Sequence, residues 1–225
     1  MGTESDGGAQ GVQEYLRADE PRGWLLLADP FRRVEGGTAL LVGVGAVAAT
    51  ALLGLYGGIA YDGVADLHVG QPLPPALRAL LPVADWLIAV AVLGLAGRLF
   101  SRSRQRLVDY LGMVGAARLP MAVLGTLLLP GLLGRFLEPL NRLLAENPQA
   151  FTQRVPQLPG LPGLVAVGVV TVVLVIWTAV LTYFALQEAS GMSRGKALAV
   201  FVGAALVAEV LSKIAVGMLG GLLGA

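Results

Sequence analysis

The sequence contains no cysteine and a single histidine, His68. Without cysteine the chain has no disulfide, no thiolate nucleophile and no iron–sulfur ligands. One histidine also leaves too few nitrogen and sulfur ligands for a zinc centre. These absences exclude the commonest metal and thiol chemistries, and we expect neither a metal nor a cofactor.

Charged residues are also scarce. They make up 14% of the 225 residues, whereas 56% are hydrophobic and the mean hydropathy is +0.73. Soluble domains carry about a quarter charged residues, so most of this surface must face hydrocarbon. The formal net charge is +1, which gives no electrostatic basis for binding nucleic acid. The partner that composition indicates is a lipid bilayer.

Long apolar segments are abundant. A membrane-spanning helix needs about 20 apolar residues, and five segments meet that requirement. They are residues 38–60, 80–99, 110–133, 164–187 and 197–223. The sequence therefore predicts an all-α polytopic membrane protein, with a five-helix transmembrane domain over residues 38–225.

The orientation of this bundle follows from Lys and Arg in its connecting segments, because cytosolic loops carry more of both. If the N-terminus is inside, the inner segments contain ten such residues: Arg17, Arg22, Arg32, Arg33, Arg98, Arg102, Arg104, Arg106, Arg194 and Lys196. The outer segments contain four: Arg78, Arg135, Arg142 and Arg154. We therefore expect the N-terminus inside and the C-terminus outside.

Residues 1–37 form the predicted cytosolic tail. Its second half mixes apolar and basic residues, which favours an amphipathic helix lying on the inner membrane surface. Trp24 and Phe31 would anchor it at headgroup level, with Arg32 and Arg33 near anionic lipid. A plain linker is the alternative interpretation.

The outer loops differ in character. The first contains Asp62, Asp66 and His68, which we expect to be solvated. The second includes an apolar and charged stretch, 135–145, typical of a short amphipathic helix at the outer surface. Four prolines then follow within 141–163, and they predict an extended connector because proline fixes φ and removes a donor.

Small and hydroxylated residues indicate how the helices associate. Close backbone approach and hydrogen bonds drive helix packing in lipid. Glycines spaced four apart in the fifth segment, such as Gly217 and Gly221, favour a helix contact there. Thr171, Thr178 and Thr182 share one face of the fourth segment, and that face is predicted to point into the bundle.

Four ionisable residues fall inside the spans: Asp85, Arg118, Glu209 and Lys213. A rise of about 1.5 Å per residue puts three of them, all but Arg118, roughly 20–25 Å from the inner side, with Arg118 roughly 13 Å in. Ionisable groups at such depth usually face the bundle interior. We therefore predict one buried polar cluster with a formal charge of zero. Its ion pairs either fix helix register or form a proton relay, an ion relay or a polar substrate pocket.

One catalytic motif is present by spacing alone. Residues 191–195 read Gly-Met-Ser-Arg-Gly, which fits the G-x-S-x-G pattern of serine hydrolases. That motif requires a preceding strand and a histidine base. No strand pattern precedes Ser193, and His68 is predicted to lie across the bilayer. Ser193 is better explained as a helix N-cap, and the sequence does not predict an enzyme.

The order of several short motifs resembles a known family. They are Asp-Pro-Phe at 29–31, Asp-Tyr at 109–110, Arg-Leu-Pro at 118–120, Tyr-Phe-Ala-Leu at 183–186 and Gly-Met-Ser-Arg-Gly-Lys-Ala at 191–197. The chain resembles the bacterial branch of the Yip-one family over roughly residues 24–225. The family consists of Rab-interacting, five-span membrane proteins with a cytosolic N-terminus.

The resemblance sets the functional expectations. It implies a non-enzymatic scaffold or adaptor in a bacterial inner membrane, with a membrane-protein partner or a homo-oligomer. The chain lacks the Asp-Leu-x-Gly-Pro signature of the eukaryotic branch, so Rab-type GTPase binding is not expected. The alternative is a small transporter or channel subunit that uses the predicted cluster of Asp85, Arg118, Glu209 and Lys213.

Overall fold

The computed structural model describes residues 29–32, 36–61, 63, 66–69, 73–101, 106–129, 132–146, 149, 154–157 and 160–223. The chain divides into two compact units, residues 1–30 and 31–225. Only Asp29 and Pro30 of the first unit are described, at the start of a short 3₁₀ turn, η1 (Pro30–Arg32). Trp24 and Arg33, two of the predicted membrane anchors, lie outside the described residues.

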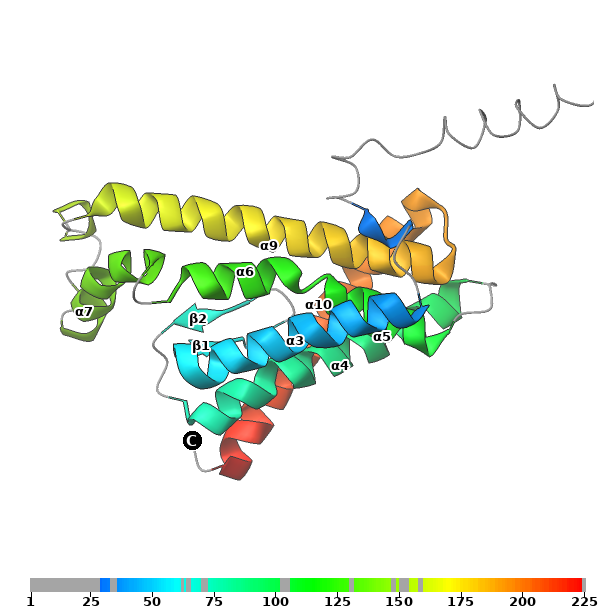
Figure 1. Cartoon of the computed structure of the whole chain (residues 1–225), viewed down its shortest axis with the longest axis horizontal. Coiled ribbons are helices and arrows are strands. Elements are labelled where there is room, and N and C mark those ends of the chain that lie inside the picture. The colour runs from blue at the N-terminus through cyan, green and yellow to red at the C-terminus, as the bar shows by residue number, and fades with distance from the viewer. Residues whose placement is uncertain are drawn as a thin grey trace, which may run out of the picture. The chain divides into compact units, whose positions relative to one another are not determined.

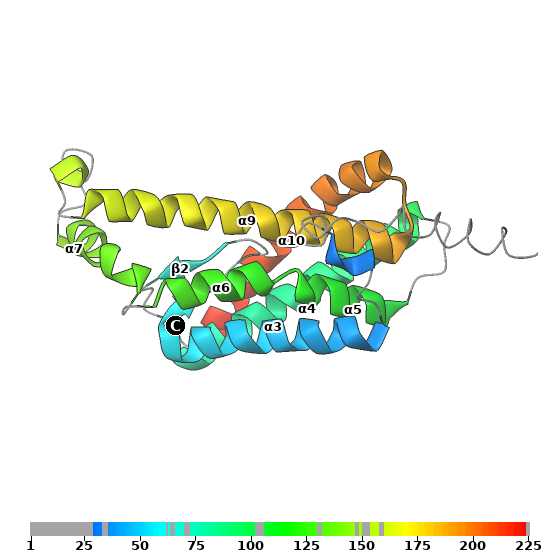
Figure 2. The same ribbon diagram turned by 45° about the horizontal axis from the view of Figure 1, so that its top comes forward.

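The second unit contains the five expected spans (Figures 1 and 2). Four of them are single helices: α3 (Gly36–Gly57), α4 (Pro75–Phe100), α9 (Leu161–Ser190) and α10 (Arg194–Leu223). The remaining span, Leu107–Leu127, consists of α5 (Leu107–Ala116) and α6 (Leu119–Leu127). The predicted all-α bundle of five spans is therefore confirmed.

The break between α5 and α6 has a local cause. Pro120 stands at the start of α6 and has no N–H to donate to the carbonyl four residues earlier. Arg118, at the break, instead donates its N–H to the Gly115 carbonyl three residues back, at 3.0 Å. The third span is thus interrupted at the position of its one basic residue.

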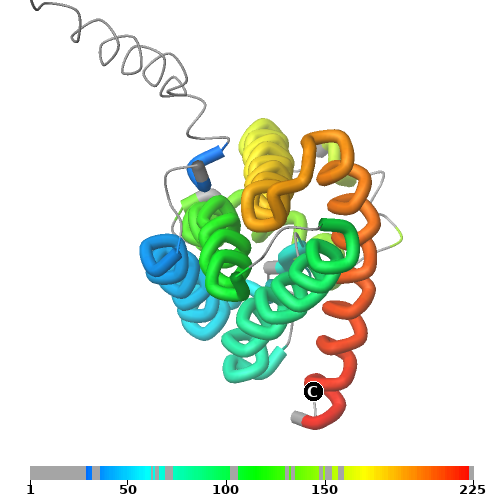
Figure 3. Tube along the Cα trace, turned by 90° about the vertical axis from the view of Figure 1, so that its right-hand side faces the viewer, coloured from blue at the N-terminus to red at the C-terminus, as the bar shows by residue number. Residues whose placement is uncertain are grey.

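One end of the bundle carries Arg98, Arg106, Arg194 and Lys196, and we call it the basic end. The beginnings of α3, α5 and α10 and the ends of α4 and α9 lie there (Figures 1 and 3). Hydrogen bonds from side chains to the backbone connect these helix ends. Asp109 Oδ1 accepts a hydrogen bond from the Gly36 N–H at 3.2 Å, and the Ser101 hydroxyl donates to the Ser190 carbonyl at 2.6 Å.

One close helix contact joins α3 and α5 through glycine. A Cβ added to Gly115 would lie 2.8 Å from the Gly43 Cα, and one added to Gly43 would overlap the Gly112 carbonyl. Backbones approach this closely only where side chains are absent. Phe31, predicted as a membrane anchor, is 3% exposed and belongs to a core cluster beside this contact, so its ring contacts protein.

The connection between α3 and α4 begins with buried residues, Ile59, Ala60 and Tyr61, whereas His68 further along is exposed. Its strands β1 (Ile59–Ala60) and β2 (His68–Val69) pair antiparallel, with Ile59 opposite Val69. Ile59 and Tyr61 are fully buried and pack with Met121 and Leu124 of α6. The hairpin therefore inserts among the helices, because its apolar residues fill the space beside the third span.

The remaining described elements lie between the third and fourth spans. They are η2 (Leu133–Phe136), α7 (Glu138–Glu146) and η4 (Val155–Gln157). The helix α7 occupies the position of the predicted amphipathic segment, and Arg142 forms an ion pair with Glu138 along it. These elements lie at the end of the bundle opposite the basic end (Figure 1).

Candidate functional site

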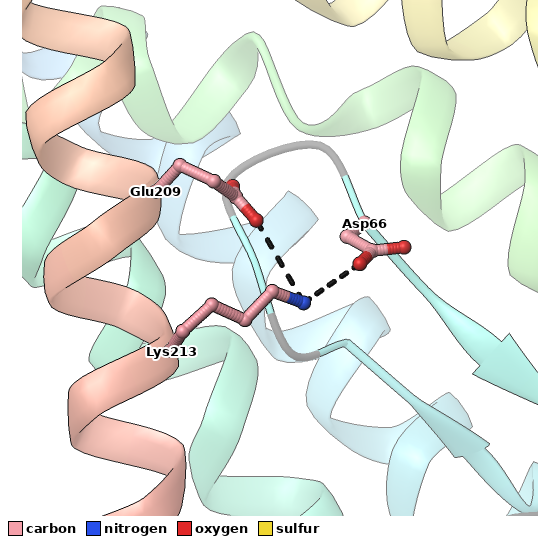
Figure 4. Close-up of polar contacts among 3 residues, drawn as sticks. All are labelled: Asp66, Glu209 and Lys213. Carbon is pink, nitrogen blue, oxygen red and sulfur yellow. Dashed lines mark hydrogen bonds and ion pairs between the residues drawn. The ribbon is translucent and has the colours of Figure 1, made fainter.

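The candidate site is a polar cluster where the hairpin meets α10. Lys213 on α10 places its Nζ 2.7 Å from Asp66 Oδ2 and 3.7 Å from Glu209 Oε1 (Figure 4). Asp66 belongs to the hairpin, 147 residues away in the chain. The lysine ammonium thus lies between two carboxylates, and the Asp66 contact fastens the hairpin to the middle of α10.

The deeper part of the cluster consists of Asp85 on α4 and Arg118 at the break in the third span. Their exposed fractions are 1% and 3%. The Arg118 guanidinium interacts electrostatically with the carboxylates of Asp85 and Glu209 and with Tyr61. Mutual attraction of this kind offsets part of the cost of removing these charges from water.

Glu209 is held in place by a close backbone contact. A Cβ added to Gly63 would lie 2.5 Å from Glu209 Oε1 and 2.8 Å from Oε2. The carboxylate therefore rests against the backbone at Gly63, in space that only glycine leaves open. This contact and the Asp66–Lys213 pair both join the hairpin to α10, and together we call them the latch.

Tyr61 connects the hairpin to the third span. Its hydroxyl donates a hydrogen bond to the Met121 carbonyl at 3.3 Å. Burial raises the pKa of Tyr61, and the positive charge of Arg118 opposes that rise. The phenol consequently stays protonated at any physiological pH and remains a donor.

The four residues predicted from sequence are thus linked through Glu209. It interacts electrostatically with Arg118, which also interacts with Asp85, and it forms an ion pair with Lys213. Only Asp85 and Arg118 are buried, whereas Lys213 is exposed, so the predicted burial of the whole cluster is wrong. Sequence reasoning missed Asp66, because the loop was expected to be solvated. The one available signal was the pair Ile59 and Tyr61, whose bulk suits a buried segment better than a loop tip. With Asp66, the five described residues comprise three acids and two bases.

The cavity that touches the cluster has an apolar wall. It encloses about 320 Å³ between α4, α9 and α10, and Glu209 lies at its edge. Thr178 and Thr182 line it, but each hydroxyl donates to a carbonyl of its own helix, at 2.9 and 2.7 Å. Among the described residues, no group of three or more His, Cys, Asp or Glu side chains is arranged to hold a metal.

Comparison with known families assigns the chain. The family model of the Yip1 domain matches residues 23–216. The chain belongs to the Yip1 family. The match covers the first four spans, α10 as far as residue 216 and the polar cluster, so the Yip1 domain corresponds to the membrane domain described above. Comparison with curated protein sequences and with solved structures gave no significant match.

Proposed function

We propose that this Yip1 protein is a non-enzymatic scaffold or adaptor in a bacterial inner membrane. The observation that supports this function best is the pairing of the charges in the polar cluster. Lys213 forms ion pairs with Asp66 and Glu209, and the buried Arg118 interacts electrostatically with Asp85 and Glu209. Ion pairs of this kind hold helices in one register. The adjoining cavity is lined mostly by apolar side chains.

The partner contacts of such a scaffold belong at the basic end and in the N-terminal tail. Positive loops face the cytosol in inner-membrane proteins, and the loop between α4 and α5 contains Arg102, Arg104 and Arg106. A membrane-protein partner or a second copy of the chain, presenting acidic or polar groups at that level, would complement this charge.

The experiment is affinity purification of the tagged full chain from native membranes, with quantitative mass spectrometry of the proteins recovered. A variant with Gln at 102, 104 and 106 should lose a specific protein partner. A matched variant with Gln at the outer-loop positions 135, 142 and 154 carries the same charge change at the opposite end and should retain it. If both variants and the unaltered chain recover only lipid, the adaptor function is wrong.

A transporter or channel subunit is the second candidate, and one observation favours it. The third span is broken beside the buried Arg118, and discontinuous helices often form ion and substrate sites in transporters. Proton flux into liposomes containing the purified chain tests this function. A flux that Glu209→Gln abolishes would support transport, whereas no flux above protein-free liposomes would leave the scaffold as the better explanation.

A further inference from the structure

A narrow groove separates α4 from α5 near the basic end. It encloses about 210 Å³. Its lining is apolar along most of its length and ends in a cationic side chain: Val90, Ala91, Gly94, Leu95, Arg98, Leu107 and Tyr110. The groove is separate from the polar cluster described above, since it shares no residue with it.

The groove opens toward the surroundings of the bundle rather than its interior. Leu95 and Leu107, on its two walls, are 59% and 57% exposed. Its floor is formed by Gly94 and the buried ring of Tyr110, where an added Cβ on Gly94 would lie 3.9 Å from the ring. In a five-span protein this outward surface faces lipid, and a concave apolar surface there accommodates a chain of similar width.

The position of Arg98 fixes the level of the groove in the membrane. Arg98 lies in the last turn of α4, two residues before the helix ends at Phe100. A hydrocarbon core of about 30 Å is shorter than α4, whose 26 residues span about 39 Å. Arg98 is therefore at headgroup level, while Gly94 and Val90 lie about 6 and 12 Å deeper by helical rise.

The charges around this mouth favour an anion. Arg98 and Tyr110 line the same end of the groove, next to Leu107. The N-terminus of α5 begins at the same mouth with Leu107, and helix N-termini favour negative charge. The acid in that first turn, Asp109, accepts a hydrogen bond from the Gly36 N–H of α3.

We propose that the α4–α5 groove binds one anionic phospholipid of the leaflet at the basic end, with its phosphate at Arg98 and an acyl chain along Gly94 and Val90. The apolar walls select a chain, and the guanidinium selects the phosphate, to which arginine makes strong charge-assisted hydrogen bonds. A free phosphate ion would use only the mouth. A zwitterionic lipid would fill the groove but carry no net negative charge for Arg98.

The test is competitive lipid retention by the purified full chain, measured by native mass spectrometry with phosphatidylglycerol and phosphatidylcholine of identical chains. The unaltered chain should retain one phosphatidylglycerol with about a tenfold preference. Arg98→Gln should reduce that preference to near parity. Arg194→Gln removes one exposed charge at the same end of the bundle, away from the groove, and should keep the preference.

Two further measurements distinguish the contribution of the apolar groove to lipid retention from that of the Arg98 charge. Ala91→Leu fills the groove without changing charge and should lower retention of both lipids. Inorganic phosphate at millimolar concentration should not displace phosphatidylglycerol, because it cannot use the apolar walls. Equal retention of the two lipids by the unaltered chain, an equal effect of Arg98→Gln and Arg194→Gln, or displacement by phosphate alone would each overturn the proposal.

Discussion

At the scale of single residues, Lys213 is central to the polar cluster because two carboxylates depend on it. Its ammonium is 2.7 Å from Asp66 and 3.7 Å from Glu209. The side chains of Lys213 and Asp66 are each 43% exposed, so their attraction is weaker than that of a fully buried pair. The pair therefore positions the hairpin more than it stabilises the whole fold.

A double-mutant cycle measures this pair. Asp66→Asn and Lys213→Gln each remove one charge, and their effects on unfolding in detergent should not add. We expect a coupling free energy of about 1 kcal/mol, within the range for contacting charged residues. Trp86 and Trp177 fluorescence provides the readout. The same cycle with Lys196→Gln, on an exposed residue at the basic end, is the control and should show no coupling.

The contact at Gly63 gives a second residue-scale prediction. Gly63→Ala should destabilise the protein by about 1–3 kcal/mol, as overpacking does, because the new methyl would overlap the Glu209 carboxylate. Gly45→Ala is the matched control. An added Cβ on Gly45 has no neighbour within 4 Å among the described residues, and alanine favours the helix. Adding Glu209→Ala should recover part of the stability lost in Gly63→Ala; no recovery would contradict the contact.

At the scale of elements, the inserted hairpin closes the bundle beside α10. Ser212, one residue before Lys213, is fully buried, and its hydroxyl has no hydrogen-bond partner among the described residues. Its burial depends on α10 staying against its neighbours. The latch, formed by the Asp66–Lys213 pair and the Gly63–Glu209 contact, therefore controls how well water is kept from this part of the interior.

Cysteine accessibility tests the latch. The chain has no cysteine, so Ser212→Cys introduces a single thiol of similar size. It should react slowly with a water-soluble maleimide, because buried thiols are inert. Adding Asp66→Asn should increase the rate, whereas adding Arg142→Gln, which breaks the exposed ion pair of α7, should not. Equal rates in all three backgrounds would show that the latch does not shield this position.

The spans and the break in the third of them were predictable from the sequence, whereas the glycine contacts between helices were not. Apolar length predicted every span, and Pro120 beside Arg118 marks the break in the third. Glycine spacing was less informative. An added Cβ on Gly217 or Gly221 of α10 would have no neighbour within 4 Å among the described residues, whereas Gly43 and Gly115 form a close contact between α3 and α5. A chain rich in glycine has many such spacings, and only the tertiary arrangement selects the ones that pack.

At the scale of the whole molecule, the polar cluster was predictable in part. Depth along each helix brought Asp85, Glu209 and Lys213 to one level, because helical rise converts sequence position into height. The depth of Asp66 could not be calculated in this way, because a loop has no fixed rise per residue. The acidic, glycine-containing sequence of this loop is also typical of solvated turns. Its role depends on the hairpin folding inward, which is a property of the assembled bundle.

The proposals for partner and lipid binding share one premise about the molecule. The premise is that five crossings put the two chain ends on opposite faces and that the basic end faces the cytosol, the side that positively charged loops favour. The loop with Arg102 and Arg104 meets cytosolic partners only in this orientation, and the α4–α5 groove takes lipid from the inner leaflet only in this orientation. Both proposals therefore depend on the direction in which the chain inserts.

Single-cysteine labelling at the two termini tests this claim most directly. Ser5→Cys and Ala225→Cys would be expressed separately in the cysteine-free chain and exposed to a membrane-impermeant maleimide in sealed vesicles of known orientation. Inverted vesicles should label Ser5→Cys, and right-side-out vesicles should label Ala225→Cys. Labelling of both positions from the same face, or of each from the opposite face to the one predicted, would contradict it.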